Sequence, residues 1–298
     1  MKRRVLMMLF AAALAMAWPL ARGLRIAWYE YNNFDQPRTR PTRPRDAAAL
    51  GLLDAEFRTS DGLTMRGWYI PSRTGASVIL VGGSGSDRNA MLDHARALCV
   101  GGTGALLFDL PGTGFSDGRA GVGEGERAAV AAAVDYVRAR PDVHHGRIGI
   151  IGFSLGSWAS LLIGAADARI RAFVVEGVFD DPWSQTKMEY EDAGPLAQWG
   201  ALLGARLAGM ERSPGGTREA VRLIAPRPLL FVAGTRDMTV PASLTRAVYD
   251  AASEPKQFWL IKGAAHGGYV SADSSFGPRL RAYVESVLAD SARAHVTH

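Results

Sequence analysis

The stretch RIGIIGFSLGSWASLLIGAA, residues 147–166, decides the fold. Residues 147–151 form a short apolar run without polar alternation, which is typical of a strand buried on both faces of a parallel sheet. Residues 157–166 are predicted to form a helix, and Gly152 and Gly156 flank Ser154 at the junction. A serine on a sharp strand-to-helix turn needs a strained backbone, and flanking glycines remove side chains that would clash. The stretch therefore predicts a strand, a tight turn that presents Ser154, and a helix.

Predicted strands, turns and helices continue along the chain in both directions from this stretch. Asp61-Gly62 separates two segments, 55–60 and 63–70, in which apolar and polar residues alternate. This pattern predicts a β-hairpin. Further apolar strands are expected at 77–81, 105–108, 171–175, 228–233 and 257–261, with helices at 88–100, 124–140 and 278–293. Buried strands separated by helices predict an α/β fold: a mainly parallel sheet of about eight strands with helices on both faces.

Composition narrows the class of protein. The chain has 298 residues, of which 48% are hydrophobic and 21% charged, an ordinary globular composition. These values exclude a disordered chain, a collagen and a polytopic membrane protein. Cys99 is the single cysteine, so no intramolecular disulfide and no cysteine-based metal cluster is possible.

The net charge of +5 is unevenly distributed. Residues 1–46 hold nine basic and three acidic residues, a net of +6. The remaining 25 basic and 26 acidic residues give residues 47–298 a net of −1. A nucleic-acid-binding domain carries its basic surplus on its own surface, so we expect no nucleic-acid partner.

The N-terminal segment has two interpretations. Three basic residues follow Met1, and residues 5–21 are uncharged, which is the pattern of a secretory signal with a cleavage site at Ala15-Met16-Ala17. The alternative is an uncleaved membrane anchor, with Trp18, Trp28 and Tyr29 at the lipid–water interface. Both interpretations predict a protein that is membrane-anchored or exported, and the first would leave Trp18 as the new N-terminus.

Three segments are therefore expected along the chain. Residues 1–21 form the signal or anchor, residues 22–46 a tether whose Pro/Arg-rich part (36–46) is extended, and residues 47–298 the main domain. About fifty residues separate the strand at 171–175 from the one at 228–233, too many for a simple crossover. Within them we expect residues 181–222 to form a helical cap over the active edge of the sheet. The alternative is an additional helix on the flank.

Two more residues complete a catalytic pattern with Ser154. Asp237 (GTRDMTVP, 234–241) and His266 (GAAHGG, 263–268) each follow a predicted strand. An aspartate at a strand end is well placed to orient an imidazole, and a glycine-flanked loop brings the ring over the serine. The order Ser154, Asp237, His266 is that of the α/β-hydrolase triad.

On these motifs, residues 55–290 resemble an α/β-hydrolase of the serine hydrolase group, which includes serine aminopeptidase-like and membrane-anchored esterase or acylglycerol-lipase branches. The segment DLPGTGFSD, 109–117, is similar to the family's D-x-x-G-x-G-x-S loop after the fourth strand. The oxyanion hole is expected from backbone N–H groups: that of Leu155, and, by the resemblance, that of Ser84. This chain has Gly82-Gly83 where the family commonly has His-Gly, which leaves the identity of the second donor open.

Several other polar residues have a structural and a functional interpretation. Asp180 and Asp181 are reserve candidates for the triad acid, or part of a turn. Glu176 is a contact for a substrate amine, or a structural hydrogen-bond partner. The segment Asp87-Arg88-Asn89 caps a helix, or contacts substrate. The remaining histidines lack the spacing of metal ligands, and they are His94, His144, His145, His295 and His298. No P-loop is present, and we expect neither a metal nor an organic cofactor.

The sequence thus predicts a serine hydrolase that cleaves a carboxylic ester. Its substrate is expected to be a small-molecule acyl compound, and the reaction is expected to pass through an acyl-enzyme. A lipophilic acyl chain fits the apolar cap and the N-terminal segment. A serine peptidase or amidase acting on small peptides is the alternative within enzymes. A non-catalytic, membrane-tethered α/β-hydrolase scaffold is the alternative outside them. The pattern leaves the oligomeric state open.

Overall fold

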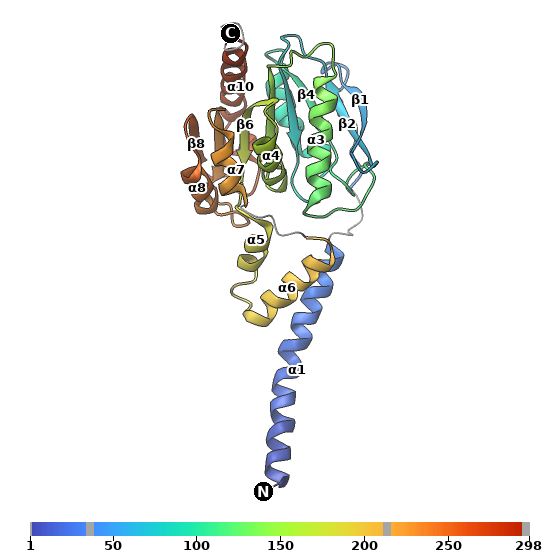
Figure 1. Ribbon diagram of the computed structural model, residues 1–298, viewed down its shortest axis with the longest axis vertical. Helices are drawn as coiled ribbons and strands as arrows, with labels where there is room; N and C mark the ends of the chain where they lie inside the picture. Colours follow the sequence, from blue (N-terminus) through green and yellow to red (C-terminus); the bar gives the residue numbers. More distant parts are fainter. Residues whose placement is uncertain (1, 34–38, 211–215, 294–298) are drawn as a thin grey trace.

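An eight-stranded sheet in the order β1-β2-β4-β3-β5-β6-β7-β8 forms the centre of the molecule (Figure 1). The structure is a computed structural model, and it describes residues 2–33, 39–210 and 216–293. Strand β2 runs antiparallel to both β1 and β4, and all the other neighbouring strands are parallel. The predicted α/β fold with about eight strands is confirmed.

The strands follow the predicted apolar runs closely. Their bounds are β1 Leu53–Arg58, β2 Thr64–Ile70, β3 Ser77–Val81, β4 Gly104–Phe108, β5 Ile148–Phe153, β6 Ile170–Glu176, β7 Leu229–Gly234 and β8 Lys256–Ile261. Every residue of β3, β4 and β7 is buried. Burial on both faces is the reason that these strands show no polar alternation.

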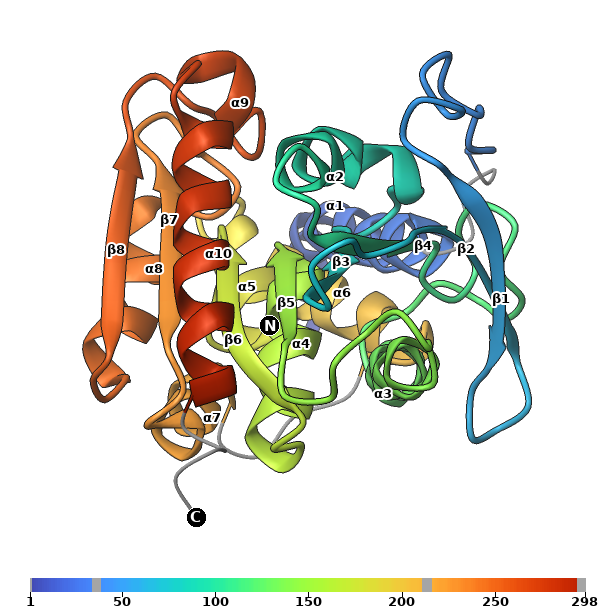
Figure 2. The same cartoon turned by 90° about the horizontal axis from the view of Figure 1, so that it is seen from above.

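Helices cover both faces of the sheet (Figure 2). One face carries α2 (Leu92–Cys99), preceded by the 3-10 turn η1 (Arg88–Met91), together with α9 (Tyr269–Ala272) and α10 (Phe276–Arg293). The other face carries α3 (Glu124–Arg138), α4 (Leu155–Ala166), α7 (Gly216–Ile224) and α8 (Ala242–Ala251). Each layer has its own apolar core, and the sheet separates the two.

The connection after β6 projects from the sheet. It holds α5 (Pro182–Glu189) and α6 (Pro195–Leu207), which lie below the body in Figure 1. Helix α7 begins inside the expected cap of 181–222 but packs on α4 and α8, so it belongs to the body. The projecting part is therefore shorter than predicted and consists of α5 and α6.

The N-terminal segment differs from the expected tether. A single helix, α1 (Lys2–Asn33), runs through residue 22 without a break and packs along α6. Residues 22–33 are helical because they contain no proline and because Gly23 and Ala27 find a partner in α6. Among the described residues, no helix has both the length and the apolar character needed to cross a membrane.

Residues 39–46 are also held more closely than an extended tether would be. Arg43 donates to the Asp54 carboxylate at 2.8 Å, and Asp46 accepts two hydrogen bonds from Arg96, at 2.8 and 2.9 Å. Pro41 is buried. These contacts fix the chain to the body between α1 and β1.

Candidate active site

Ser154 stands on the turn between β5 and α4, in a strained backbone conformation. Its φ of 52° and ψ of −117° lie in a region that residues other than glycine rarely adopt. The flanking glycines are required by space. A Cβ on Gly152 would lie 2.5 Å from the Gly156 carbonyl oxygen, and one on Gly156 would lie 2.3 Å from the Val81 carbonyl oxygen. The predicted tight turn is therefore present, with Ser154 at its apex.

The structure brings Ser154, His266 and Asp237 together from three different strand ends. His266 Nε2 lies 3.0 Å from Ser154 Oγ, and His266 Nδ1 lies 2.8 Å from Asp237 Oδ2. A carboxylate only accepts hydrogen bonds, so Nδ1 carries the proton toward Asp237 and Nε2 is left to accept one from the serine hydroxyl. The three side chains form one continuous hydrogen-bonded chain.

Asp237 is buried and held in place by its own loop. Its side chain is fully covered, whereas that of His266 is 21% exposed. The Asp237 Oδ1 atom accepts backbone N–H groups of Thr239 and Val240, at 3.0 and 2.7 Å. With one oxygen bound to the loop, the other is fixed toward His266.

The His266 ring is enclosed by neighbours that sequence reasoning did not identify. The Phe153 ring packs against it with centroids 4.7 Å apart. Gly177, at a φ of +55°, passes close by, and a Cβ there would lie 3.1 Å from His266 Cε1. Neither residue had a signal of its own, because their proximity to His266 depends on the packing of strand ends that are distant in the sequence.

The loop after β3 reaches the serine at Gly83. A Cβ on Gly83 would lie 3.3 Å from Ser154 Cβ. Gly83 precedes Ser84, so the peptide that joins them lies beside the serine. Leu155 is the first residue of α4, where backbone N–H groups have no partner within the helix. The N–H groups of Ser84 and Leu155 remain our prediction for the oxyanion hole.

Comparisons with known proteins agree with this fold. A family model described as X-Pro dipeptidyl-peptidase (S15 family) matches residues 84–222. An uncharacterized protein of Mycobacterium tuberculosis (strain H37Rv) is 32% identical over 220 residues, which cover 72% of each chain. The polyketide transferase GrgF of a Penicillium species is 25% identical over 274 residues, covering 76% of this chain and 93% of that protein.

Solved structures give the same result. The crystal structure of the α/β hydrolase GrgF aligns with a TM-score of 0.65 at 24% identity, covering 80% of this chain and 99% of that one. A Pyrococcus furiosus esterase aligns with a TM-score of 0.69 at 22% identity, covering 85% and 99%. The chain belongs to the α/β-hydrolase superfamily. The resemblance to this superfamily that we inferred from the motifs is confirmed.

The two reserve candidates for the triad acid form contacts away from His266. The Asp180 carboxylate pairs with Arg218 on α7 at 2.6 Å. The Asp181 side chain accepts the Ser184 N–H and caps α5. Both therefore follow their structural interpretation, and Asp237 is the acid that contacts His266.

Glu176 and His94 form a buried pair beside the site. His94 Nε2 lies 2.9 Å from Glu176 Oε1, and both side chains are at most 10% exposed. Burial disfavours the charged imidazole, but the Glu176 carboxylate outweighs burial and raises the pKa of His94 above its ordinary value. The Glu176 backbone oxygen accepts the Ser154 N–H at 2.8 Å, so this pair packs behind the catalytic turn.

The segment 109–117 has a structural role. Asp109 is fully buried and accepts the Arg88 and Phe115 backbone N–H groups, at 2.8 and 2.9 Å. It also forms an ion pair with the buried Arg88 side chain. Asp87 caps η1 through the Asn89 N–H. The loop and the segment 87–89 thus stabilise each other and the start of α2.

Of the remaining histidines, His144 and His145 are exposed in a turn, and His295 and His298 lie outside the described residues. Within the described part of the chain, no three or more His, Cys, Asp or Glu side chains are grouped to hold a metal ion.

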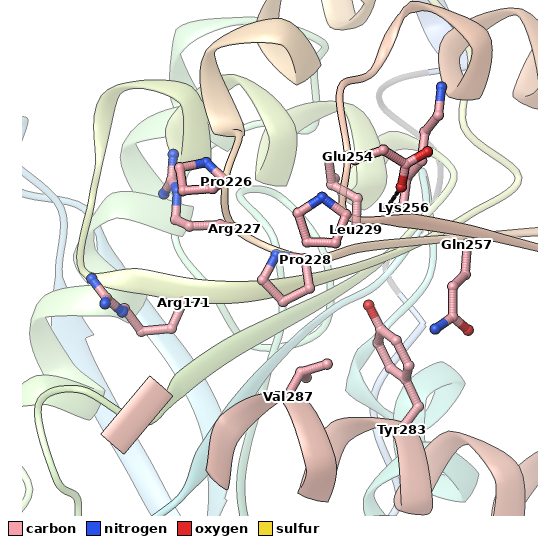
Figure 3. A pocket seen from close by; sticks show the side chains of 11 residues that line it. Arg171, Pro226, Arg227, Pro228, Leu229, Glu254, Lys256, Gln257, Tyr283 and Val287 are labelled. Carbon is pink, nitrogen blue, oxygen red and sulfur yellow. Dashed lines mark hydrogen bonds between the residues drawn. The ribbon is translucent and has the colours of Figure 1, made fainter. Parts of the chain in front are cut away.

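A cavity of about 490 Å³ lies at the other end of the sheet (Figure 3). Its lining includes Arg171, Pro228 and Lys256, which lie at the amino ends of β6, β7 and β8. Ser154 and Asp237 instead follow the last residues of their strands. Lys256 Nζ donates to the Tyr249 and Ala252 carbonyl oxygens, at 2.9 and 2.8 Å, so its charge is used in packing the strand onto α8.

Proposed function

We propose that this protein is a serine hydrolase that cleaves carboxylic esters through an acyl-enzyme. The observation that carries the proposal is the chain of hydrogen bonds from Asp237 through His266 to Ser154, at 2.8 and 3.0 Å, with Ser154 at a φ of 52°. Each contact lies within the range in which a base removes a proton from a nucleophile.

The geometry supports the following reaction. His266 Nε2 takes the proton of Ser154 as Oγ attacks the ester carbonyl carbon, and Asp237 stabilises the imidazolium that forms. The N–H groups of Leu155 and Ser84 donate hydrogen bonds to the carbonyl oxygen and stabilise the negative charge that develops on it. His266 then gives its proton to the departing alkoxide, which leaves as the alcohol. Water attacks the acyl-serine by the same route and releases the carboxylic acid.

A peptidase or amidase is the second candidate, because the matching family model is described as an X-Pro dipeptidyl-peptidase. The two candidates share the nucleophile and differ in the leaving group. A panel of p-nitrophenyl esters of rising chain length, measured beside aminoacyl amides, separates them. We expect the esters to be hydrolysed with the higher kcat/KM.

The decisive experiment is labelling with a fluorophosphonate probe, which reacts with an activated serine. We expect the folded wild type to be labelled at Ser154, and Ser154→Ala to lose labelling and at least about 10⁴-fold of its turnover. Ser160→Ala is the matched control, since Ser160 is a buried serine in α4, the helix that follows Ser154. Folded wild-type protein that stays unlabelled would leave the non-catalytic scaffold as the better interpretation.

A further inference from the structure

The first half of α1 exposes apolar side chains on all sides. Seven apolar residues between positions 5 and 18 are between 52% and 78% exposed: Val5, Leu6, Met7, Met8, Phe10, Met16 and Trp18. Consecutive residues of a helix point about 100° apart, so positions 5–8 alone cover its whole circumference. A helix that is apolar all round is stable inside a protein core or a membrane, not in water.

The second half of α1 is apolar on one side only. Leu20, Leu24 and Trp28 are spaced by four residues, so they form one stripe, and they are 46%, 50% and 68% exposed. On α6, Trp199 and Leu207 are also exposed, and Trp199 borders the contact with Gly23. Tryptophan is enriched where a membrane meets water, because its ring is apolar and its N–H is polar.

Small residues join α1 and α6 at very short range. A Cβ on Gly200 would lie 2.0 Å from the Gly23 carbonyl oxygen, and one on Gly204 would lie 2.1 Å from the Ala27 carbonyl oxygen. Each helix thus presents two small residues four positions apart to the other. This spacing is the one that packs helices together within lipid, where burial of apolar surface provides no driving force.

Helix α5 connects the α1–α6 pair to the catalytic loop. The Tyr190 hydroxyl, at the end of α5, donates to Glu30 of α1 at 2.5 Å. Within α5, Gln185 Nε2 donates to the Thr239 carbonyl oxygen at 2.6 Å, and the Thr239 N–H is bound to Asp237. These contacts fix the position of α1 relative to the triad.

Helix α1 projects from one particular edge of the sheet. Helix α5 leaves the carboxyl end of β6, and in Figure 1 it lies, with α6, between the body and the free end of α1. Ser154, Asp237 and His266 follow the carboxyl ends of β5, β7 and β8 at the same edge of the sheet. The triad edge therefore faces the direction in which α1 projects.

We propose that α1 and the exposed side of α6 insert into a lipid bilayer, and that the triad takes its ester substrates, acyl lipids, from that bilayer. A bilayer surrounds an inserted helix, whereas a protein groove covers one side of it, and the exposure at positions 5–8 requires cover on all sides. The net charge of +6 in residues 1–46 suits the anionic surface of a membrane. The substrate part of the inference rests on the proposed serine hydrolase activity.

Flotation of the full-length protein with vesicles of phosphatidylcholine and phosphatidylglycerol tests the insertion. The double variant Phe10→Glu/Leu24→Glu places charge on the exposed apolar surface of α1. Its matched control is Val100→Glu/Leu223→Glu, because those residues are 69% and 62% exposed on the body. We expect the wild type and the control to float and the α1 variant to float at least tenfold less. Equal flotation of both variants, flotation of neither the wild type nor the control, or a mature chain that begins at Trp18, would overturn the insertion.

The substrate is tested with a fluorogenic acylglycerol in the same vesicles, beside soluble p-nitrophenyl butyrate. We expect the α1 variant to cleave the vesicle ester at least tenfold more slowly than the control variant, relative to its rate on the soluble ester. If the two ratios agree while the soluble ester is cleaved, the lipid substrate is wrong and the hydrolase assignment stands. If Ser154 is unlabelled and neither ester is cleaved, the hydrolase proposal itself fails, and flotation still decides whether α1 inserts.

Discussion

At the scale of single residues, Asp237 has two tasks that its two oxygens divide. Oδ1 accepts hydrogen bonds from the N–H groups of its own loop, and Oδ2 accepts one from the protonated Nδ1 of His266. An asparagine keeps the shape but presents an NH₂ group to either the loop or the ring, which disturbs the loop or favours the wrong tautomer of the imidazole.

We therefore expect Asp237→Asn to lower kcat by about 10⁴-fold. Steady-state kinetics on a p-nitrophenyl ester provide the measurement. Asp180→Asn is the matched control, since Asp180 also follows a strand end but pairs with Arg218. A large rate loss in the control with a small loss in Asp237→Asn would reverse the assignment of the acid.

The His94–Glu176 pair leads to a prediction for pH. The pKa of His94 is raised in the folded protein, so the folded state holds this proton more tightly than the unfolded state. The resulting stabilisation is complete below the unfolded value of about 6.5 and is lost as the pH rises through the raised value. We expect the free energy of unfolding of the wild type to fall over that range relative to His94→Gln, which does not titrate.

Denaturant unfolding at a series of pH values measures this difference. His145→Gln is the control, because His145 is exposed, and its curve should parallel that of the wild type. If the His94→Gln curve parallels the wild type as well, the pair does not hold the proton in the folded state. The sequence alone could not reveal the pair, because 82 positions separate its members and each had an ordinary structural interpretation.

At the scale of elements, the strands were predictable and the partner of α1 was not. Residues 77–81 and 229–234 are buried throughout, and that burial is written into the sequence as runs without polar residues. The turn at Ser154 was predictable because two glycines are needed within five positions. In the sequence, the only sign of the contact between α1 and α6 is the pair of small residues Gly200 and Gly204. Such a pair does not indicate which helix packs against it. For that reason residues 22–33 were expected to be a tether.

Gly200→Leu should separate α1 from α6. The new side chain would begin 2.0 Å from the Gly23 carbonyl oxygen, a distance that requires the helices to move apart. A helix that loses its packing partner is marginally stable in water. We expect the amides of residues 23–31 to exchange hydrogen at least tenfold faster, as measured by mass spectrometry on the full-length protein.

Leu207→Ala is the matched change on α6, because Leu207 is 63% exposed and away from the glycine contact. It should leave exchange in α1 as it is in the wild type. Unchanged exchange in Gly200→Leu would mean that α1 does not depend on α6 for its local stability.

At the scale of the whole molecule, charge and apolar surface are concentrated in the same part of the chain. Residues 1–46 carry a net charge of +6, and residues 47–298 carry −1. Most of the large apolar side chains that are strongly exposed among the described residues lie on α1. The two contributions to membrane binding are thus separable: attraction between charges weakens with salt, whereas burial of apolar surface does not.

This separation predicts how binding depends on salt and on lipid charge. In dilute salt we expect the full-length protein to float more with anionic vesicles than with neutral ones, since each basic residue near the surface contributes about 1 kcal/mol. Raising the salt from about 0.01 M to about 1 M shortens the screening length from about 30 Å to about 3 Å. Binding to anionic vesicles should then fall to the level seen with neutral vesicles and remain there, because the apolar side chains of α1 still insert.

The variant Phe10→Glu/Leu24→Glu should show the opposite balance, with salt-sensitive binding to anionic vesicles and little binding to neutral ones. Equal flotation with both vesicle types in dilute salt would mean that the basic residues of the N-terminal segment do not face the lipid.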